Sequence, residues 1–201
     1  MIIEHMSKIP KIDPSAYIAP NATLCGEVVI GKNARIMFGA QIIAENGPVT
    51  LGDNCIVLEN AVIRGAEGFP VRIGDNCLMG PHAHLAGCTL MDNVFVATGA
   101  SVFHGALLMT GSEVRINGIV HLRSVLKEGA FVPIGWIAVG NPAKILPPDQ
   151  HDAIWTEQGH LNFPKTVYGI DRPGPGEPGI MPDICRTMSE RLSRHKDDKI
   201  I

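Results

Sequence analysis

Residues 12–42 read IDPSAYIAPNATLCGEVVIGKNARIMFGAQI, and an aliphatic side chain recurs at every sixth position of this stretch. These aliphatic residues are Ile12, Ile18, Leu24, Ile30, Ile36 and Ile42. Four residues after most of them comes a small side chain, as at Ala16, Ala22, Ala34 and Ala40. A fixed period of this kind is typical of a solenoid, in which each unit buries its apolar face against its neighbours.

The repeat continues to Val132, with extra residues before Leu51 and within GAEGFPVR, and with one shortened step between Leu85 and Leu90. A strand of two or three residues cannot bury a face alone. Three such strands can form a triangular coil, in which aliphatic residues meet at the axis and small residues occupy the corners. Stacked coils then pair edge to edge about 4.8 Å apart. The sequence therefore predicts an all-β solenoid of about seven triangular coils between residues 12 and 140.

Beyond the repeat, prolines interrupt the pattern in GNPAKILPP. We expect a β-helix domain over residues 1–145, a C-terminal helix over 146–165, a Pro/Gly-rich linker over 166–180 and a short helical tail over 181–201. The C-terminal region is expected to act as a cap or an oligomer arm rather than as a catalytic domain.

Composition and charge narrow the class of protein. Lys and Arg number 17 against 20 Asp and Glu, and they form no basic stripe before the tail, so we expect no nucleic-acid partner. The N-terminus lacks a signal-peptide pattern, and no apolar run is long enough to cross a membrane.

The five cysteines include no CxxC pair, which favours reduced thiols in a cytoplasmic protein. Cys55 and Cys77 fall on inward positions and are expected to be packing thiols rather than a redox pair.

Residues 71–108, VRIGDNCLMGPHAHLAGCTLMDNVFVATGASVFHGALL, resemble the γ-class carbonic anhydrases of the hexapeptide-repeat superfamily. Members of this family carry an I-G-x-x-x-x-x-G-H-x-x-x-L-H-G-C-T core, a D-G-A corner close to HGA at 104–106, and a GNPAK ending like that at 140–144. The resemblance spans about residues 10–165. It implies a left-handed parallel β-helix, a homotrimer, and a small-molecule ligand bound at each subunit interface.

The resemblance places the family's three zinc histidines at Arg64, Pro81 and Ala86 of this chain. None of these side chains is a zinc ligand, whereas zinc needs three or four N, O or S donors on one tetrahedron. The sequence therefore disfavours zinc at the family positions, and with it the usual hydration of CO₂ by a metal-bound hydroxide. His82 and His84, in GPHAHLAGC at 80–88, are the remaining candidates for a displaced metal site, although their side chains should diverge in an extended segment. No cofactor is specified.

Counting the hexads in threes places several polar residues beside the lost ligand positions. Arg64 is a candidate anchor for an anionic substrate group, and its alternative is an ion pair with Glu59. Glu59, His82 and His84 are candidate groups for moving protons. The hexad count places neither histidine among the inward-pointing residues, so neither is expected in the core. The alternative to a role in proton transfer is packing against a neighbouring subunit.

Candidate substrate-binding residues are Glu45, Asn117 and His121. Glu45 falls where the family has R-G-D and could act as a base, or it is an exposed glutamate. Asn117 and His121 would line the upper wall of the same groove, and His104 is a further groove residue. The remaining histidines lie outside the repeat and are expected at the surface: His5, His151, His160 and His195.

Three functions from different classes remain open at this stage. The first is a γ-carbonic anhydrase-like homotrimer whose remodelled interface site performs acid/base chemistry on a small anionic or carbonyl substrate. The second is a hexapeptide-repeat acyltransferase that uses acyl-CoA. The short insertions count against it, because such enzymes usually carry their histidine on a long loop. The third is a non-catalytic scaffold or subunit that kept the trimer and lost the chemistry.

Overall fold

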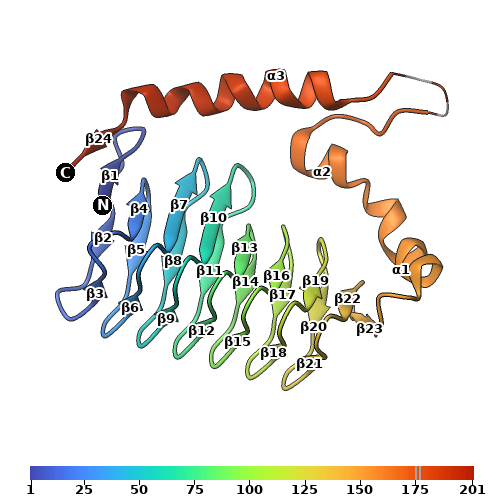
Figure 1. Ribbon diagram of the computed structural model, residues 1–201, viewed down its shortest axis with the longest axis horizontal. Helices are drawn as coiled ribbons and strands as arrows, with labels where there is room; N and C mark the ends of the chain where they lie inside the picture. Colours follow the sequence, from blue (N-terminus) through green and yellow to red (C-terminus); the bar gives the residue numbers. More distant parts are fainter. Residues whose placement is uncertain (175, 177) are drawn as a thin grey trace.

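The repeat region winds into a parallel β-helix in the computed structural model, which describes residues 1–174, 176 and 178–201 (Figure 1). Three sheets run along the solenoid, and successive strands of the chain enter them in rotation, so each sheet pairs strands three elements apart. The predicted fold class, a left-handed parallel β-helix with C-terminal helices, is confirmed.

The first sheet contains eight parallel strands and one antiparallel strand at each end. The parallel strands are β1 (Ile2–Glu4), β4 (Thr23–Cys25), β7 (Gln41–Glu45), β10 (Val62–Ala66), β13 (His84–Ala86), β16 (Ser101–Val102), β19 (Ile119–Val120) and β22 (Ile137–Val139). The antiparallel strands are β23 (Lys144–Leu146), beside β22, and β24 (Lys199–Ile200), beside β1.

The other two sheets contain seven parallel strands each. The second sheet is β2 (Lys11–Ile12), β5 (Val28–Ile30), β8 (Val49–Leu51), β11 (Val71–Ile73), β14 (Thr89–Leu90), β17 (Leu107–Leu108) and β20 (Val125–Leu126). The third is β3 (Tyr17–Ile18), β6 (Arg35–Ile36), β9 (Ile56–Val57), β12 (Leu78–Met79), β15 (Phe95–Val96), β18 (Glu113–Val114) and β21 (Phe131–Val132). The extra strand of the first sheet is β1, which precedes the first predicted hexad.

The core is a stack of aliphatic side chains along the axis of the solenoid. Ile63, Leu85, Val102 and Val120 are register partners in successive coils, and all four are fully buried. The predicted hexad frame therefore holds in this region. Cys55 and Cys77 are also buried and form no disulfide, as expected for packing thiols.

Asparagines at several corners adopt left-handed backbone conformations and stack from coil to coil. Asn33, Asn54 and Asn76 have φ values of 54°, 57° and 57°. The Asn54 side-chain amide donates to Oδ1 of Asn76 at 3.1 Å, and Asn33 donates to Asn54 at 3.4 Å. Asparagine tolerates this backbone region better than most residues, so the sharp corner is retained without glycine.

The two insertions in the repeat lengthen β7 and β10 to five residues each, so these strands extend beyond their neighbours on one side of the solenoid (Figure 1). The two strands pair along their whole length, up to Ala66 beside Glu45. The insertions therefore build a local wall rather than a long loop.

After β23 the chain forms helices α1 (His151–Gln158), α2 (Phe163–Tyr168) and α3 (Met181–Leu192), with 3-10 turns at Gly159–Leu161 and Ser193–Asp197. Figure 1 shows α3 running back along the solenoid toward the N-terminus. The C-terminal strand β24 then pairs with β1, with Ile200 opposite Ile3. Among the described residues, no helix is long and apolar enough to span a membrane.

Candidate functional site

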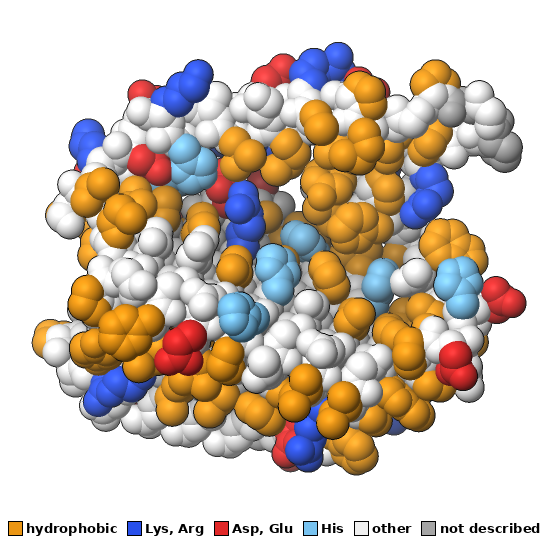
Figure 2. All heavy atoms as spheres, viewed as in Figure 1, with side chains coloured by type: hydrophobic (Ala, Val, Ile, Leu, Met, Phe, Trp, Pro, Cys, Tyr) orange, Lys and Arg blue, Asp and Glu red, His pale blue; other side chains and the backbone are white. Residues whose placement is uncertain are grey.

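A cavity of about 350 Å³ lies between the extended strands of the first sheet and the C-terminal helices. The solenoid side of the cavity includes Glu45, Arg64, His84, Ala86 and His104. Residues of α2 and α3 cover it: Val167, Tyr168, Met188, Arg191 and Leu192. Figure 2 shows histidine side chains gathered on this face of the solenoid, below the hollow that α3 borders.

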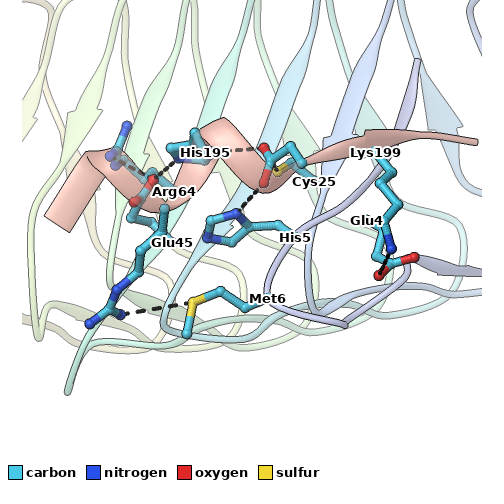
Figure 3. Close-up of polar contacts among 10 residues, drawn as sticks. Glu4, His5, Met6, Cys25, Glu45, Arg64, His195 and Lys199 are labelled. Carbon is cyan, nitrogen blue, oxygen red and sulfur yellow. Dashed lines mark hydrogen bonds and ion pairs between the residues drawn. The ribbon is translucent and has the colours of Figure 1, made fainter.

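Arg64 forms an ion pair with Glu45 inside this cavity (Figure 3). Nη2 of Arg64 donates to Oε2 of Glu45 at 3.0 Å. Because Arg64 is the register partner of Ile43, Glu45 is its diagonal neighbour on the same outward face. The alternative pairing of Arg64 with Glu59 is therefore wrong. The alternative that Glu45 is an exposed glutamate is wrong as well, since its side chain is only 14% exposed.

His84 lies on the outward face of β13, half-buried in the cavity wall. Burial lowers the pKa of His84 below its usual value, and the positive charge of Arg64 lowers it further. Burial also lowers the pKa of His104, and the charges of His84 and Arg64 lower it further. Both imidazoles are therefore neutral at pH 7 and able to accept a proton.

His104 carries a buried ring nitrogen, Nδ1, that has no hydrogen-bond partner among the described residues. Its ring meets the edge of Phe69, with ring centroids 5.2 Å apart and planes at 81°. An unpaired buried nitrogen is costly unless water or a ligand satisfies it. His104 therefore carries an unpaired polar atom buried in the wall of the cavity.

His121 continues the same outward face, beyond the cavity. Its ring lies 6.4 Å from that of Phe103, which lies 6.4 Å from His84 in turn. Burial lowers the pKa of His121. The three rings therefore form a row along the first sheet, with His84 at the end that opens into the cavity.

Glu59, His82 and Asn117 lie at the corner between the third and first sheets and do not line the cavity. His82 is exposed in a left-handed conformation with φ 57°, and its backbone N–H donates to the Glu59 carbonyl at 3.0 Å. Asn117 has φ 54° at the equivalent corner of a later coil. The single chain therefore brings together Glu45, Arg64 and His84 but separates them from the corner residues.

The residues at the family's zinc positions do not fit a metal ion. Arg64 carries a fixed positive charge that would repel a cation, and Pro81 has no side-chain donor. Ala86 is the register partner of Arg64 and is 4% exposed, so it leaves room beside the guanidinium but offers no ligand atom. Zinc requires donors that this set lacks.

Two histidines that were expected at the surface, His5 and His195, belong to a polar cluster beside the cavity. His5 is 2% exposed. Nε2 of His195 lies 2.8 Å from Oε2 of Glu45, and its Nδ1 lies 2.7 Å from Oδ2 of Asp198. Glu45 therefore links Arg64 in the cavity to the C-terminal tail.

A sequence signal for this cluster does exist at the two ends of the chain. MIIEHM at residues 1–6 and HKDDKII at 195–201 each combine an Ile-Ile run with a histidine. The first run lies in β1 and the second begins in β24, and the pairing of these strands brings the adjoining polar residues together. The expectation that His5 is a surface residue fails because β24 and the tail cover it.

Comparisons with known proteins point to one superfamily. A family model described as the hexapeptide repeat of succinyl-transferase matches residues 70–104. The mitochondrial gamma carbonic anhydrase 1 of Arabidopsis thaliana is 30% identical over 145 residues, or 69% of this chain and 50% of that protein. A carbonic anhydrase of Geobacillus kaustophilus is 25% identical over 146 residues, or 73% of this chain and 77% of that protein.

Among solved structures, a hexapeptide transferase family protein from Anaplasma phagocytophilum matches with a TM-score of 0.56 and 27% identity, covering 84% of this chain and 97% of that one. The chain spans half the length of the plant relative it matches.

Proposed function

Because this chain is a γ-carbonic anhydrase-like protein built on the hexapeptide repeat, we propose that it retains the fold and uses the cavity beside α3 as a metal-free acid/base site. The proposed substrate is a small anionic or carbonyl compound. The observation that carries this proposal is the placement of Arg64 next to the neutral imidazoles of His84 and His104 in one cavity.

The charge of the cavity favours an anion. Three arginines line it, Arg64, Arg191 and Arg194, against two glutamates, Glu45 and Glu67. Arg191 is half-buried and forms no ion pair within the described part of the chain. In a partly desolvated cavity a guanidinium binds a carboxylate or an enolate through paired N–H donors. Arg64 would anchor the substrate, and Glu45 would hold Arg64 in position.

The chemistry that this arrangement supports is proton transfer. A neutral imidazole accepts a proton from an acidic C–H or O–H of the bound substrate, and the negative charge left on the substrate is stabilised by Arg64. His84 is the proposed base because it lies nearest in the fold to the Arg64 strand, with Val62 as its register partner. His104 would return the proton or hold the second polar group of the substrate.

We also propose that the chain forms a homotrimer, as the family resemblance implies. Large apolar side chains remain exposed on and near the third sheet, including Ile116, Phe131 and Ile134 at 46%, 55% and 66% exposure. Apolar groups exposed together in this way are typical of a subunit contact. Glu59, His82, Asn117 and His121 would then face or adjoin the neighbouring subunit. Sedimentation equilibrium at several protein concentrations tests this, and a monomer throughout would contradict it.

Solvent isotope exchange tests the proposed chemistry directly. The protein is incubated in D₂O with a panel of small 2-oxo acids and 3-oxo acids, and deuterium incorporation next to the carbonyl is measured by mass spectrometry. We expect exchange above the buffer rate with at least one member, and a loss of about 100-fold or more in Arg64→Gln and His84→Gln. His160→Gln, at an exposed position on the C-terminal region, is the matched control and should exchange like the wild type.

An acyltransferase is the second candidate, because the matched family model and the Anaplasma structure are both described as transferases. A thermal shift with acetyl-CoA tests it, and a rise in the melting temperature would favour this function. If neither isotope exchange nor a shift with acetyl-CoA is found, the result would favour a non-catalytic scaffold.

A further inference from the structure

We propose that this chain binds a divalent transition-metal ion, with zinc the best match, at a site that joins its two ends: His5, Cys25, His195 and Asp198 (Figure 3). This site is separate from the positions where the family holds zinc. It does not rest on the proposed function of the cavity.

The four side chains offer a suitable set of donor atoms at close range. One ligand atom from each residue lies within 4.8 Å of the others. Asp198 is central: Oδ1 lies 2.6 Å from Nδ1 of His5, and Oδ2 lies 2.7 Å from Nδ1 of His195 and 3.9 Å from Sγ of Cys25. Donors around tetrahedral zinc stand about 3.3–3.8 Å apart. Shifts of less than an ångström would therefore admit the ion.

Three separate elements of the fold position these donors. His5 follows β1 directly, and Cys25 ends β4, with Ile3 as its register partner. His195 and Asp198 lie in the turn that precedes β24. His5 and Cys25 are 2% and 3% exposed, so two of the donors are already desolvated. The imidazoles of His5 and His195 stack with centroids 4.3 Å apart and planes at 24°.

Glu45 provides the outer contact that metal-binding histidines commonly have. It accepts a hydrogen bond from Nε2 of His195 at 2.8 Å, which leaves Nδ1 of that ring directed at Asp198 and the other donors. A carboxylate on the far nitrogen fixes the tautomer and raises the basicity of a ligating imidazole. This arrangement distinguishes the cluster from an incidental group of polar residues.

The local charge also favours a cation. Asp198 brings a carboxylate to the cluster, and Cys25 can contribute a second negative charge as a thiolate. The Glu45 carboxylate lies beside them but is shared with Arg64. Burial raises the pKa of the Cys25 thiol to about 11, with further contributions from Asp198 and Glu45. Without an ion, Cys25 therefore remains protonated. A bound divalent ion would take the thiolate, and the thiol proton would pass to solvent together with the Nδ1 proton that His195 directs at Asp198.

The expected role is structural, because four protein ligands leave no open coordination position. The ion would join residues 5 and 25 of the first coils to residues 195 and 198 of the tail. It would thereby hold β24 on β1 and α3 over the cavity. Its effect on the cavity would pass through Glu45, which contacts both His195 and Arg64.

Cobalt substitution tests the proposal on the full chain. The purified protein is stripped with a chelator, dialysed under reducing conditions and titrated with Co²⁺ and with Zn²⁺. We expect one ion per chain and, with cobalt, a thiolate-to-metal charge-transfer band in the near ultraviolet. Zinc should displace the cobalt. Cys25→Ser should abolish the band, and His195→Asn should weaken binding by at least tenfold.

Two matched controls identify the site. Cys185→Ser makes the same chemical change at an exposed cysteine of α3 and should retain the band. His84→Gln alters the cavity but not the cluster, so its metal content should equal that of the wild type. The proposal is overturned if the wild-type protein gives no band, if the band persists in Cys25→Ser, or if it is lost in either control. The wild-type titration stands on its own: the absence of a band there overturns the proposal whether or not the variants fold.

Discussion

The most informative perturbation of this molecule is Glu45→Gln, which keeps the shape of the side chain and removes its charge. Glu45 accepts two charge-assisted hydrogen bonds at one oxygen, from Arg64 at 3.0 Å and from His195 at 2.8 Å. Glu45 is 14% exposed, whereas Arg64 and His195 are 33% and 32% exposed. The acceptor is therefore largely desolvated, but both donors are partly hydrated.

A hydrogen bond to a charged group contributes about 1.5–3 kcal/mol when well buried, and partial exposure reduces this to about 1 kcal/mol per contact. We therefore expect Glu45→Gln to lower the free energy of unfolding by about 2 kcal/mol. For a chain of this size, that loss corresponds to a fall in melting temperature of about 4–8 °C. Loss of the His195 contact alone should raise the rate of backbone amide exchange in α3 and β24 about fivefold.

Thermal denaturation and hydrogen exchange with mass spectrometry measure the two effects. Glu67→Gln is the matched control, because Glu67 also lines the cavity but is exposed and has no ion-pair partner in the described residues. This control should change the free energy of unfolding by no more than about 0.5 kcal/mol. If Glu45→Gln changes the melting temperature no more than Glu67→Gln, the role assigned to Glu45 as the link between cavity and tail is refuted.

The remaining predictions concern the core, the corners and pH. Leu85→Ala should lower the free energy of unfolding by about 2–5 kcal/mol, measured by urea denaturation, because Leu85 is fully buried in the axial stack. Asn54→Ala should cost about 1–2 kcal/mol through its left-handed backbone, and Asn54→Gly should cost less. Burial lowers the pKa values of His84, His104 and His121 in the folded state, so the unfolded chain takes up protons first as pH falls below about 6.5. The urea concentration at the midpoint of unfolding should therefore decrease as the pH is lowered from about 7 to about 5.5. His121→Gln should make that decrease smaller.

The architecture could be predicted from the sequence because the hexad period is local and redundant. Each coil repeats the same choice of an inward aliphatic and a small corner residue, so one misread unit does not change the register. The columns derived from that count match the observed partners Val62, His84, Ser101 and Ile119 in successive coils. The hexad count missed β1, which precedes the first hexad, and β23 and β24, which lie beyond the repeat.

The site was harder to predict because its residues meet through contacts between distant parts of the chain. The hexad count placed Arg64 beside the lost ligand positions, and the family resemblance placed Glu45 near the same site. Neither indicates that β7 and β10 pair far enough to join the two residues. The hexad count also carries no information about the tail, which returns 150 residues later to contact Glu45 through His195. The assignment of His5 to the surface failed for that reason, whereas His195 remains partly exposed.

Histidine ring resonances, followed by NMR during titration with pyruvate, acetoacetate and bicarbonate, test most directly the claim that the cavity is a remodelled anion site. We predict saturable shifts of the His84 and His104 signals with at least one of these anions. The shifts should disappear in Arg64→Gln and persist in Arg72→Gln, which makes the same change at an exposed arginine outside the cavity. Unchanged His84 and His104 signals with all three anions, or equal binding by Arg64→Gln, would contradict the account.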